Sequence, residues 1–311
     1  MLTLLLSTYN RSDVLAKTLD SFTELAPPED GWKVVIVDNR SDDNTREVAL
    51  SFQDRLPLSY IYEAKPGKSA ALNRGLAERE GNLVVITDDD VIARKDWLTS
   101  LEAAANSNPS YHLFGGRIMP RWEAKPCDWL AEAVSMQGNF ALTDPDWSDG
   151  PIMASCIFGP NMACKSDVFD KGLRFDELIA TDGTTTFPMG DETDFLVRAE
   201  REGFKAWFVH DAVVEHMIPA SNIKPNWLIL RAFRQGRGKV VVFQKTALAH
   251  LPKLFGSPRF LWRALLGDSL RVFLAYLQLS RPKILKARCT LNYRWGQIYQ
   301  HRIFSRRNHD G

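Results

Sequence analysis

Three consecutive carboxylates, Asp88, Asp89 and Asp90, come directly after the apolar run Leu83–Thr87. The run is rich in β-branched and aliphatic side chains, which predicts a strand buried on both faces of a parallel sheet. Open α/β sheets bind ligands at the carboxyl ends of their strands, where these carboxylates would lie. Because like charges repel, a cation is their natural partner, and Mg²⁺ takes one or two carboxylates together with water and phosphate oxygens. The alternative is a solvated acidic turn before a helix over Lys95–Ala105.

The elements that would position these carboxylates alternate between strand and helix. The predicted strands are Leu2–Ser7, Lys33–Asp38 and Leu58–Tyr62, and the predicted helices are Asp13–Leu25, a helix from Asn44 or Thr45 towards Phe52, and Ser69–Glu80. This alternation predicts an α/β fold with right-handed crossovers and a mostly parallel sheet flanked by helices. Neither a Gly-x-Gly-x-x-Gly motif nor a Walker loop follows the first strand, which argues against a dinucleotide-binding fold.

Residues 109–190 are less regular. The segment Trp122–Pro151 is rich in Trp, Asp and Pro, which indicates a long functional loop. The segment Ile157–Ala163 is typical of a strand interrupted by a tight turn, and a helix is expected to begin at Asp191 and to end at Gly203. His216 follows the short strands after this helix.

The composition is that of an ordinary globular protein, with 45% hydrophobic and 25% charged residues. The four cysteines have no metal-ligand spacing, so reduced thiols in the cytosol are the simplest interpretation. The amino terminus lacks a basic segment and has too short an apolar run for a signal peptide. The longest candidate for a membrane span, Phe260–Leu279, is interrupted by Arg263, Asp268 and Arg271. A cytoplasmic location is expected, with peripheral contact to the inner face of the cell membrane left open.

Charge is distributed unevenly along the chain. Residues 1–219 contain 21 Lys and Arg against 36 Asp and Glu, whereas residues 220–311 contain 18 against 2, a balance of +16. The basic part is also rich in Trp and Tyr, and Phe260–Leu279 mixes large apolar residues with arginines. Such a segment suits a helix that lies in an anionic membrane interface. Equally, it suits ordinary core helices that pack on the acidic part of the chain, and the sequence leaves both interpretations open.

Six short stretches occur in a recognisable order: Ser7–Arg11, Val37–Thr45, Gly67–Gly75, Thr87–Asp90, Gly159–Ala163 and Gly190–Phe195. Together they resemble the motifs of the family 2 glycosyltransferases of the GT-A fold. The resemblance covers residues 1–220, which are expected to form the glycosyltransferase domain, with residues 221–311 as a basic, aromatic-rich helical extension. It implies a nucleotide-sugar donor, Mg²⁺ or Mn²⁺ as cofactor, and inversion at the anomeric carbon.

The resemblance also assigns roles by position. The residues expected to bind the donor are Thr8, Tyr9, Arg11, Asp38, Lys68, Asn73, Asp88 and Asp89. Within this set Asp38 resembles the carboxylate that reads the nucleobase, although a turn carboxylate that accepts backbone N–H bonds is the alternative. Asp90 and His216 are expected to ligate the metal. Asp88 and Asp90 resemble the two acids of the family's Asp-x-Asp motif, and because Asp89 stands between them, the assignment of the metal ligand is open to a shift of one residue. Gly159 and Asn161 are expected near the sugar or the acceptor.

The general base is expected in the pair Asp191-Glu192. The family most often has Glu-Asp at this place, so position favours Glu192 whereas side-chain type favours Asp191. Asp191 with Asp194 also resembles a capping box, and both roles can hold if Asp191 caps and Glu192 faces the acceptor. A basic loop over the donor phosphates is expected at Arg234–Gly238.

The resulting hypothesis is an inverting, metal-dependent glycosyltransferase that acts on a hydroxyl of a saccharide or polyprenyl-linked acceptor, in cell-surface polysaccharide or glycan assembly, with no nucleic-acid partner. A nucleotidyltransferase would need a glycine- and basic-rich loop after the first strand, and Thr8–Arg11 is not one. A catalytically silent nucleotide-sugar-binding protein would be expected to lack the base or the metal acid, and this chain has both.

Overall fold

The computed structural model describes residues 1–179, 185–244 and 251–307. Outside the described residues lie 180–184, in the predicted glycosyltransferase domain, and 245–250 and 308–311, in the predicted extension. The chain divides into two compact units. We call the first, Met1–Arg121, Phe140–Leu178 and Asp191–Ile218, the sheet unit, and the second, Trp122–Asn139, Ile179–Gly190 and Pro219–Gly311, the helical unit.

A single sheet organises the sheet unit, with the order β3-β2-β1-β4-β8-β6-β9-β5 and with β7 paired to β9. Its strands are β1 (Leu2–Thr8), β2 (Trp32–Asp38), β3 (Leu58–Tyr62), β4 (Leu83–Thr87), β5 (Val91–Ala93), β6 (Leu113–Trp122), β7 (Gly150–Ile152), β8 (Met162–Lys165) and β9 (Ala206–Ile218). The first four strands pair in parallel, as predicted, and β8 joins β4 in the antiparallel direction. The carboxyl ends of β1 to β4 therefore share one edge of the sheet.

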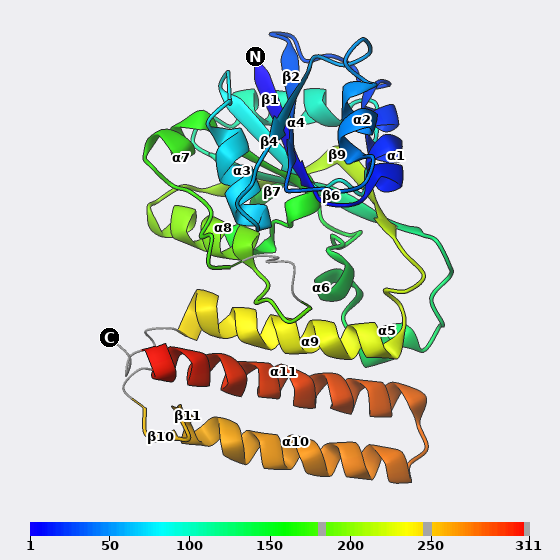
Figure 1. Ribbon diagram of the computed structural model, residues 1–311, viewed down its shortest axis with the longest axis vertical. Coiled ribbons are helices and arrows are strands. Elements are labelled where there is room, and N and C mark those ends of the chain that lie inside the picture. The colour runs from blue at the N-terminus through cyan, green and yellow to red at the C-terminus, as the bar shows by residue number, and fades with distance from the viewer. Residues whose placement is uncertain (180–184, 245–250, 308–311) are drawn as a thin grey trace. The chain divides into compact units, whose positions relative to one another are not determined.

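Helices cover both faces of this sheet (Figure 1). They are α1 (Ser12–Phe22), α2 (Thr45–Leu50), α3 (Lys68–Leu76), α4 (Trp97–Ser107), α7 (Ser166–Asp170) and α8 (Asp191–Arg201), with short 3₁₀ turns at Ala154–Cys156 and Gly159–Asn161. The helices α3, α7 and α8 lie on one face, and α1 and α2 lie on the other (Figure 1). The predicted α/β fold class is confirmed.

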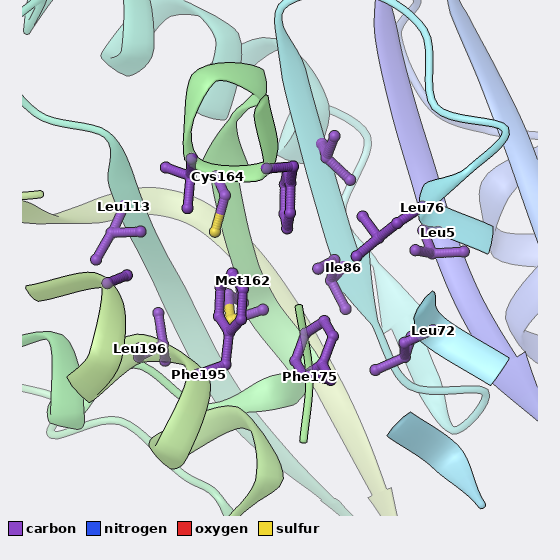
Figure 2. Close-up of a cluster of buried hydrophobic side chains, with 14 of the residues drawn as sticks. Leu5, Leu72, Leu76, Ile86, Leu113, Met162, Cys164, Phe175, Phe195 and Leu196 are labelled. Carbon is purple, nitrogen blue, oxygen red and sulfur yellow. The ribbon is translucent and has the colours of Figure 1, made fainter. Parts of the chain in front are cut away.

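A buried apolar cluster joins α3 and α8 to the sheet (Figure 2). Phe195 of α8 stacks on Phe175 and Phe169, with ring centroids 4.6 and 5.6 Å apart. Leu72 and Leu76 of α3 belong to the same cluster. Because a buried aromatic ring contributes on the order of 2–3 kcal/mol and adopts few rotamers, this packing fixes where α8 begins relative to the strand ends.

Asn161 connects four elements in the interior of the sheet unit. Its Oδ1 accepts a hydrogen bond from Trp97 Nε1 of α4 at 2.9 Å, and its Nδ2 donates to the carbonyls of Arg117 in β6 and Ala212 in β9. The side chain is fully buried. All its hydrogen-bonding groups are thus used inside the fold, whereas the sequence analysis expected Asn161 near the sugar or the acceptor.

The helical unit contains α5 (Leu130–Ala133), α6 (Met136–Phe140), α9 (Pro225–Lys239), a π-helical turn (Val240–Gln244), β10 (Lys253–Leu254), β11 (Ser257–Pro258), α10 (Arg259–Leu277) and α11 (Arg281–Arg307). The long helix α11 packs against both α9 and α10. Within the described part of the chain, every helix falls short of the length and apolar character needed to span a bilayer.

Two expectations about irregular segments were wrong. Arg234–Gly238 is part of α9 and is not a loop. A Cβ on Gly236 would overlap the carbonyl of Tyr293 in α11, so this glycine allows two helices to approach closely. The segment Trp122–Pro151 was predicted as one long loop, but it contains α5 and α6, which are too short to show helical periodicity in the sequence.

Candidate active site

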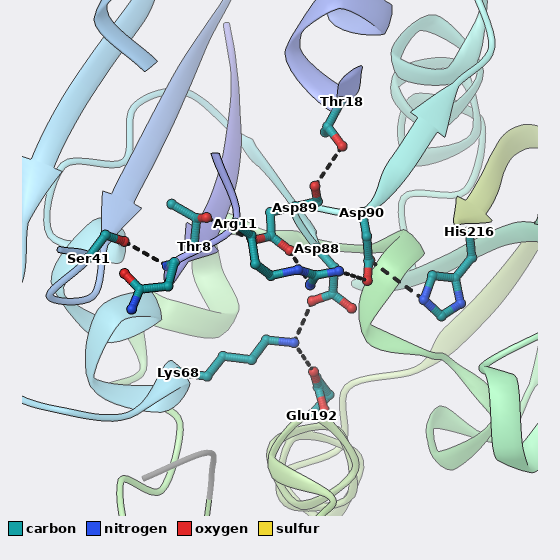
Figure 3. Close-up of polar contacts among 11 residues, drawn as sticks. Thr8, Arg11, Thr18, Ser41, Lys68, Asp88, Asp89, Asp90, Glu192 and His216 are labelled. Carbon is teal, nitrogen blue, oxygen red and sulfur yellow. Dashed lines mark hydrogen bonds and ion pairs between the residues drawn. The ribbon is translucent and has the colours of Figure 1, made fainter. Parts of the chain in front are cut away.

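The three carboxylates after β4 face different partners (Figure 3). Asp89 points into the fold, where it accepts hydrogen bonds from Thr8 Oγ1 at 2.7 Å and Arg11 Nη1 at 2.6 Å. Its own backbone carbonyl accepts a hydrogen bond from Thr18 Oγ1 of α1. Burial raises the pKa of Asp89 to about 7, against the opposing charge of Arg11. Asp89 thus anchors the strand end to β1 and α1, and Asp88 and Asp90 remain for other contacts.

Asp90 lies between a fixed cation and a histidine. Its Oδ2 accepts a hydrogen bond from Arg11 Nη2 at 2.8 Å. Its Oδ1 is buried, has no hydrogen-bond partner, and lies 3.6 Å from His216 Nε2, which is too long for a hydrogen bond. Burial opposes ionisation, but His216 and Arg11 together hold the pKa of Asp90 well below its usual range. Asp90 is therefore a buried carboxylate with one free oxygen.

The tautomer of His216 follows from its second contact. Nδ1 lies 2.7 Å from the carbonyl oxygen of Phe140, which can only accept, so Nδ1 carries the proton. Burial lowers the pKa of His216, but Asp90 and the Phe140 carbonyl outweigh burial and raise it, which favours a proton on Nε2 beside Asp90; a cation bound there would take the place of that proton. A carbonyl that orients a histidine in this way is the usual second partner of a metal-ligating imidazole.

Lys68, the first residue of α3, bridges two acidic groups from distant parts of the chain (Figure 3). Its Nζ lies 2.5 Å from Asp88 Oδ1 and 2.6 Å from Glu192 Oε1 of α8. Burial alone would lower the pKa of Lys68, but the charges of Asp88 and Glu192 raise it well above its usual value. Lys68 is consequently a permanent cation that ties the end of β4 to the start of α8.

The two acidic residues at the start of α8 differ in charge. Burial raises the pKa of Glu192, but the adjacent Lys68 ammonium outweighs burial and lowers that pKa to about 2. For Asp191, burial and the charge of Glu192 raise the pKa well above its usual value, and its Oδ2 has no hydrogen-bond partner. Asp194, expected to complete a capping box, instead accepts a hydrogen bond from Arg198 Nε. Glu192 is the ionised member of the pair and Asp191 the neutral one.

Gly159 makes room for the Glu192 carboxylate. A Cβ at position 159 would lie 2.5 Å from Glu192 Oε1 and 2.9 Å from its carboxyl carbon. These distances are too short for non-bonded contact. The 3₁₀ turn that begins at Gly159 therefore forms the wall against which Glu192 is held, next to Lys68.

Other predicted site residues have contacts away from this cluster. The Asp38 carboxylate accepts hydrogen bonds from the Ser41 backbone N–H and from Tyr60 Oη at 2.6 Å. The Asn73 amide exchanges two hydrogen bonds with the backbone of Phe175. Tyr9 is exposed.

Tyr60, which the sequence analysis did not single out, completes the surroundings of Asp38. In the parallel pairing of β2 with β3, Asp38 lies opposite Tyr62 and Ile36 lies opposite Tyr60. Tyr60 is therefore two residues before the partner of Asp38 and on the same face of the sheet. Burial and the hydrogen bond to Asp38 raise the pKa of Tyr60, which keeps its hydroxyl a donor. The register of β2 with β3 was the signal that could have identified it.

The sequence matches Glycosyl transferase family 2 over residues 3–168, more than half of the chain. The chain belongs to this family. It is 26% identical over 242 residues to Glycosyltransferase AglE from Haloferax volcanii, and the aligned region covers 76% of this chain and 71% of that protein. It is 24% identical over 240 residues to the Glucosyl-dolichyl phosphate glucuronosyltransferase of the same organism, covering 75% and 73% of the two chains.

Solved structures show the same fold as this family 2 glycosyltransferase. The mannosyltransferase PcManGT from Pyrobaculum calidifontis, in complex with GDP-Man and Mn²⁺, superposes with a TM-score of 0.61 at 20% identity, over 96% of this chain and 87% of that one. TarS 1–349 from S. aureus superposes with a TM-score of 0.56 at 16% identity, over 95% and 90% of the two chains. At these identities the likeness concerns the fold alone.

We expect Gly159→Ala to reduce glycosyl transfer by about 100-fold, because the added methyl group displaces the Glu192 carboxylate from its place beside Lys68. Turnover would be measured as sugar incorporated into acceptor, and folding by circular dichroism and thermal unfolding. Gly150→Ala is the matched control, since a Cβ there meets nothing within 4 Å. Wild-type turnover of Gly159→Ala would show that the position of Glu192 is unimportant.

Proposed function

We propose that this chain is an inverting, metal-dependent glycosyltransferase that moves a sugar from a nucleoside-diphosphate sugar to a hydroxyl group of a saccharide or lipid-linked acceptor. The observation that carries the proposal is the bridge made by Lys68, which sets an ionised Glu192 2.6 Å from its ammonium and the strand-end Asp88 2.5 Å from the same atom. The proposed base, Glu192, and a carboxylate expected on the donor side, Asp88, thus contact the same ammonium group at the edge of the sheet.

Glu192 is the general base in this proposal. A sugar hydroxyl is a poor nucleophile at neutral pH, and a carboxylate within hydrogen-bond reach can take its proton as the new bond forms. The hydroxyl oxygen bonds to the anomeric carbon, its proton passes to Glu192, and the bond to the diphosphate oxygen breaks with its electron pair on the leaving group. A single in-line displacement inverts the anomeric carbon and needs no nucleophile from the protein.

Lys68 has two effects on this base. Its charge keeps Glu192 ionised, since it lowers the pKa of Glu192 to about 2 in the buried site. The same contact weakens Glu192 as a proton acceptor, because a carboxylate with a low pKa holds protons poorly. The anionic diphosphate of a donor would compete with Glu192 for the Lys68 ammonium and so raise the basicity of Glu192 when substrate is present.

The residues around Asp90 fit a divalent cation shared with a bound diphosphate. Over residues 1–179, 185–244 and 251–307, no cluster of three or more His, Cys, Asp or Glu could hold a metal by itself. A Mg²⁺-like ion needs only one or two protein ligands when phosphates and waters complete its shell. Asp90 Oδ1, which is buried without a partner, and His216 Nε2 would hold it. When bound, it would neutralise charge on the leaving diphosphate as a Lewis acid.

The donor side of the site would consist of the predicted residues at the ends of β1, β2 and β4. Thr8 and Asp38 are partners in the pairing of β1 with β2, so both lie at the edge where α/β sheets bind ligands. Arg11 at present pairs with Asp89 and Asp90 and would also be available to a phosphate. Lys68 and Asp88 complete this side, and the roles of Tyr9 and Asn73 stay predictions.

The nature of donor and acceptor is supported by likeness to other proteins. The solved structures of PcManGT and TarS contain GDP-Man and UDP-GlcNAc, which favours a nucleotide-sugar donor here. A relative at 24% identity is named a glucosyl-dolichyl phosphate glucuronosyltransferase, which favours a lipid-linked acceptor. Transfer to such an acceptor would take place in the cytoplasm at the inner face of the cell membrane, as a step in cell-surface polysaccharide or glycan assembly.

A panel of nucleotide sugars tests the proposal. With Mg²⁺ or Mn²⁺ present, at least one uridine or guanosine diphosphate sugar should release its nucleoside diphosphate in the presence of acceptor, and EDTA should stop the release. Asp90→Ala should abolish metal-dependent turnover while the thermal unfolding curve stays cooperative, because the free Oδ1 is lost. If Asp90→Ala kept the wild-type rate in EDTA, the metal would play no part.

Glu192→Gln should lower turnover by about 10²–10⁴-fold with donor affinity retained, because the amide cannot accept the hydroxyl proton. Asp191→Asn should keep most of the turnover, since an amide resembles the protonated carboxyl that burial favours at this position. Rates would be compared at saturating donor, with donor affinity measured by calorimetry. A large loss of turnover in Asp191→Asn with little loss in Glu192→Gln would identify Asp191 as the base.

A further inference from the structure

The helix α10 has one buried face and one exposed face. Leu261, Asp268 and Ala275 are buried, and the helix packs against α11. In the helical unit α11 lies between α9 and α10 (Figure 1). The outer face of α10, which points away from α11, is therefore open to solvent.

The outer face carries a continuous row of large apolar side chains. Leu266, Leu270, Phe273 and Leu277 follow one another at intervals of four, three and four residues, which places them on one stripe of the helix. Each of them is between 58% and 73% exposed. Leu279, just beyond the helix, is 85% exposed. We call these five side chains the apolar stripe. Monomeric soluble proteins rarely expose such a contiguous patch without a partner for it.

The charges around the apolar stripe are positive. Arg259 and Arg263 continue the same helical spacing towards the start of α10, and both are exposed. The acid of this helix, Asp268, is 1% exposed and lies between Arg271 and Arg294 on the inner side. The part of α10 that faces solvent thus combines apolar side chains with arginines and no carboxylate.

We propose that the outer face of α10 docks onto an anionic membrane surface. The apolar stripe would enter the boundary between headgroups and acyl chains, with the helix lying in the plane of the interface. Arg259 and Arg263 would then contact lipid phosphates, and the surrounding excess of Lys and Arg would add attraction to an anionic leaflet. The arginines and Asp268 exclude a spanning arrangement, in agreement with the length and polarity of the described helices.

Charge complementarity selects a lipid surface over a second copy of the chain. The outer face of α10 carries Arg259 and Arg263 without a carboxylate, within a segment (residues 220–311) that contains 18 Lys and Arg against 2 Asp and Glu, so two such faces brought together would repel each other. An anionic leaflet meets both requirements of this face, an apolar environment for the stripe and negative charge for the arginines.

Vesicle co-sedimentation with the full chain tests this proposal. The protein should pellet with vesicles of phosphatidylcholine and phosphatidylglycerol at low salt, and less at high salt, because salt screens the arginines. The double variant Leu270→Asp with Phe273→Asp should lower the partition coefficient by about 100-fold, since two large apolar side chains no longer enter the interface. Arg259→Gln with Arg263→Gln should lower binding by about 25-fold on anionic vesicles and leave binding to phosphatidylcholine alone unchanged.

A matched control separates the α10 face from a general effect of charge. Met153 and Leu178 are exposed apolar residues of the sheet unit, so Met153→Asp with Leu178→Asp adds the same two charges elsewhere. This variant should pellet nearly as well as the wild type. Thermal unfolding of both double variants would verify that each is folded.

Three results would overturn the proposal. The first is wild-type protein that stays in the supernatant with anionic vesicles at low salt. The second is a control variant that loses as much binding as the α10 variant. The third is a wild-type protein that sediments as a dimer while the α10 variant sediments as a monomer. The last would make a second copy the partner. Vesicle binding needs neither donor nor acceptor, so its failure would leave the proposed transfer reaction standing.

Discussion

Compensation of three adjacent carboxylates by two basic side chains is the interaction on which the sheet unit depends. Asp88, Asp89 and Asp90 leave β4 together, and an unpaired buried carboxylate costs several kcal/mol. Arg11, at the start of α1, pairs with two of them, and Lys68, at the start of α3, pairs with the third. Each cation is placed by the turn before a helix, so the alternation of strand and helix brings the charges together.

The second acidic contact of Lys68 extends this compensation to the chemistry. Glu192 comes from α8, whose position is fixed independently by the stacking of Phe195 on Phe169 and Phe175. Lys68 therefore meets the proposed base, Glu192, at a position that the apolar core has already fixed. Burial raises the pKa of both acids at the start of α8, but the Lys68 ammonium keeps Glu192 ionised, whereas the charge of Glu192 adds to burial and keeps Asp191 neutral. Packing sets the position of the proposed base, and the lysine sets its charge.

Much of this arrangement could be predicted from the sequence, for identifiable reasons. The run Leu83–Thr87 is apolar throughout because β4 is buried on both faces, and acids after such a strand lie at the ligand-binding edge. The contact between Lys68 and Glu192 was not predictable, because 124 residues separate them and tertiary packing alone brings them together. Arg234–Gly238 looked like a loop because glycines usually mark turns, whereas Gly236 serves close packing of α9 on α11. The partners of Asn161 were hidden for the same reason, since they come from three other elements.

The pH dependence of kcat/KM in Lys68→Met tests most directly whether Lys68 governs the base. With Lys68 present, the pKa of Glu192 is lowered to about 2, so loss of activity through its protonation occurs only at very acidic pH. Without the ammonium, burial raises that pKa and only the hydrogen bonds to Glu192 oppose it, so the acid limb of the profile should move up by about two pH units. Lys65→Met, which removes the partner of the surface residue Glu177, is the control and should leave the limb in place. An acid limb in Lys68→Met that coincides with that of the wild type would contradict this account of the site.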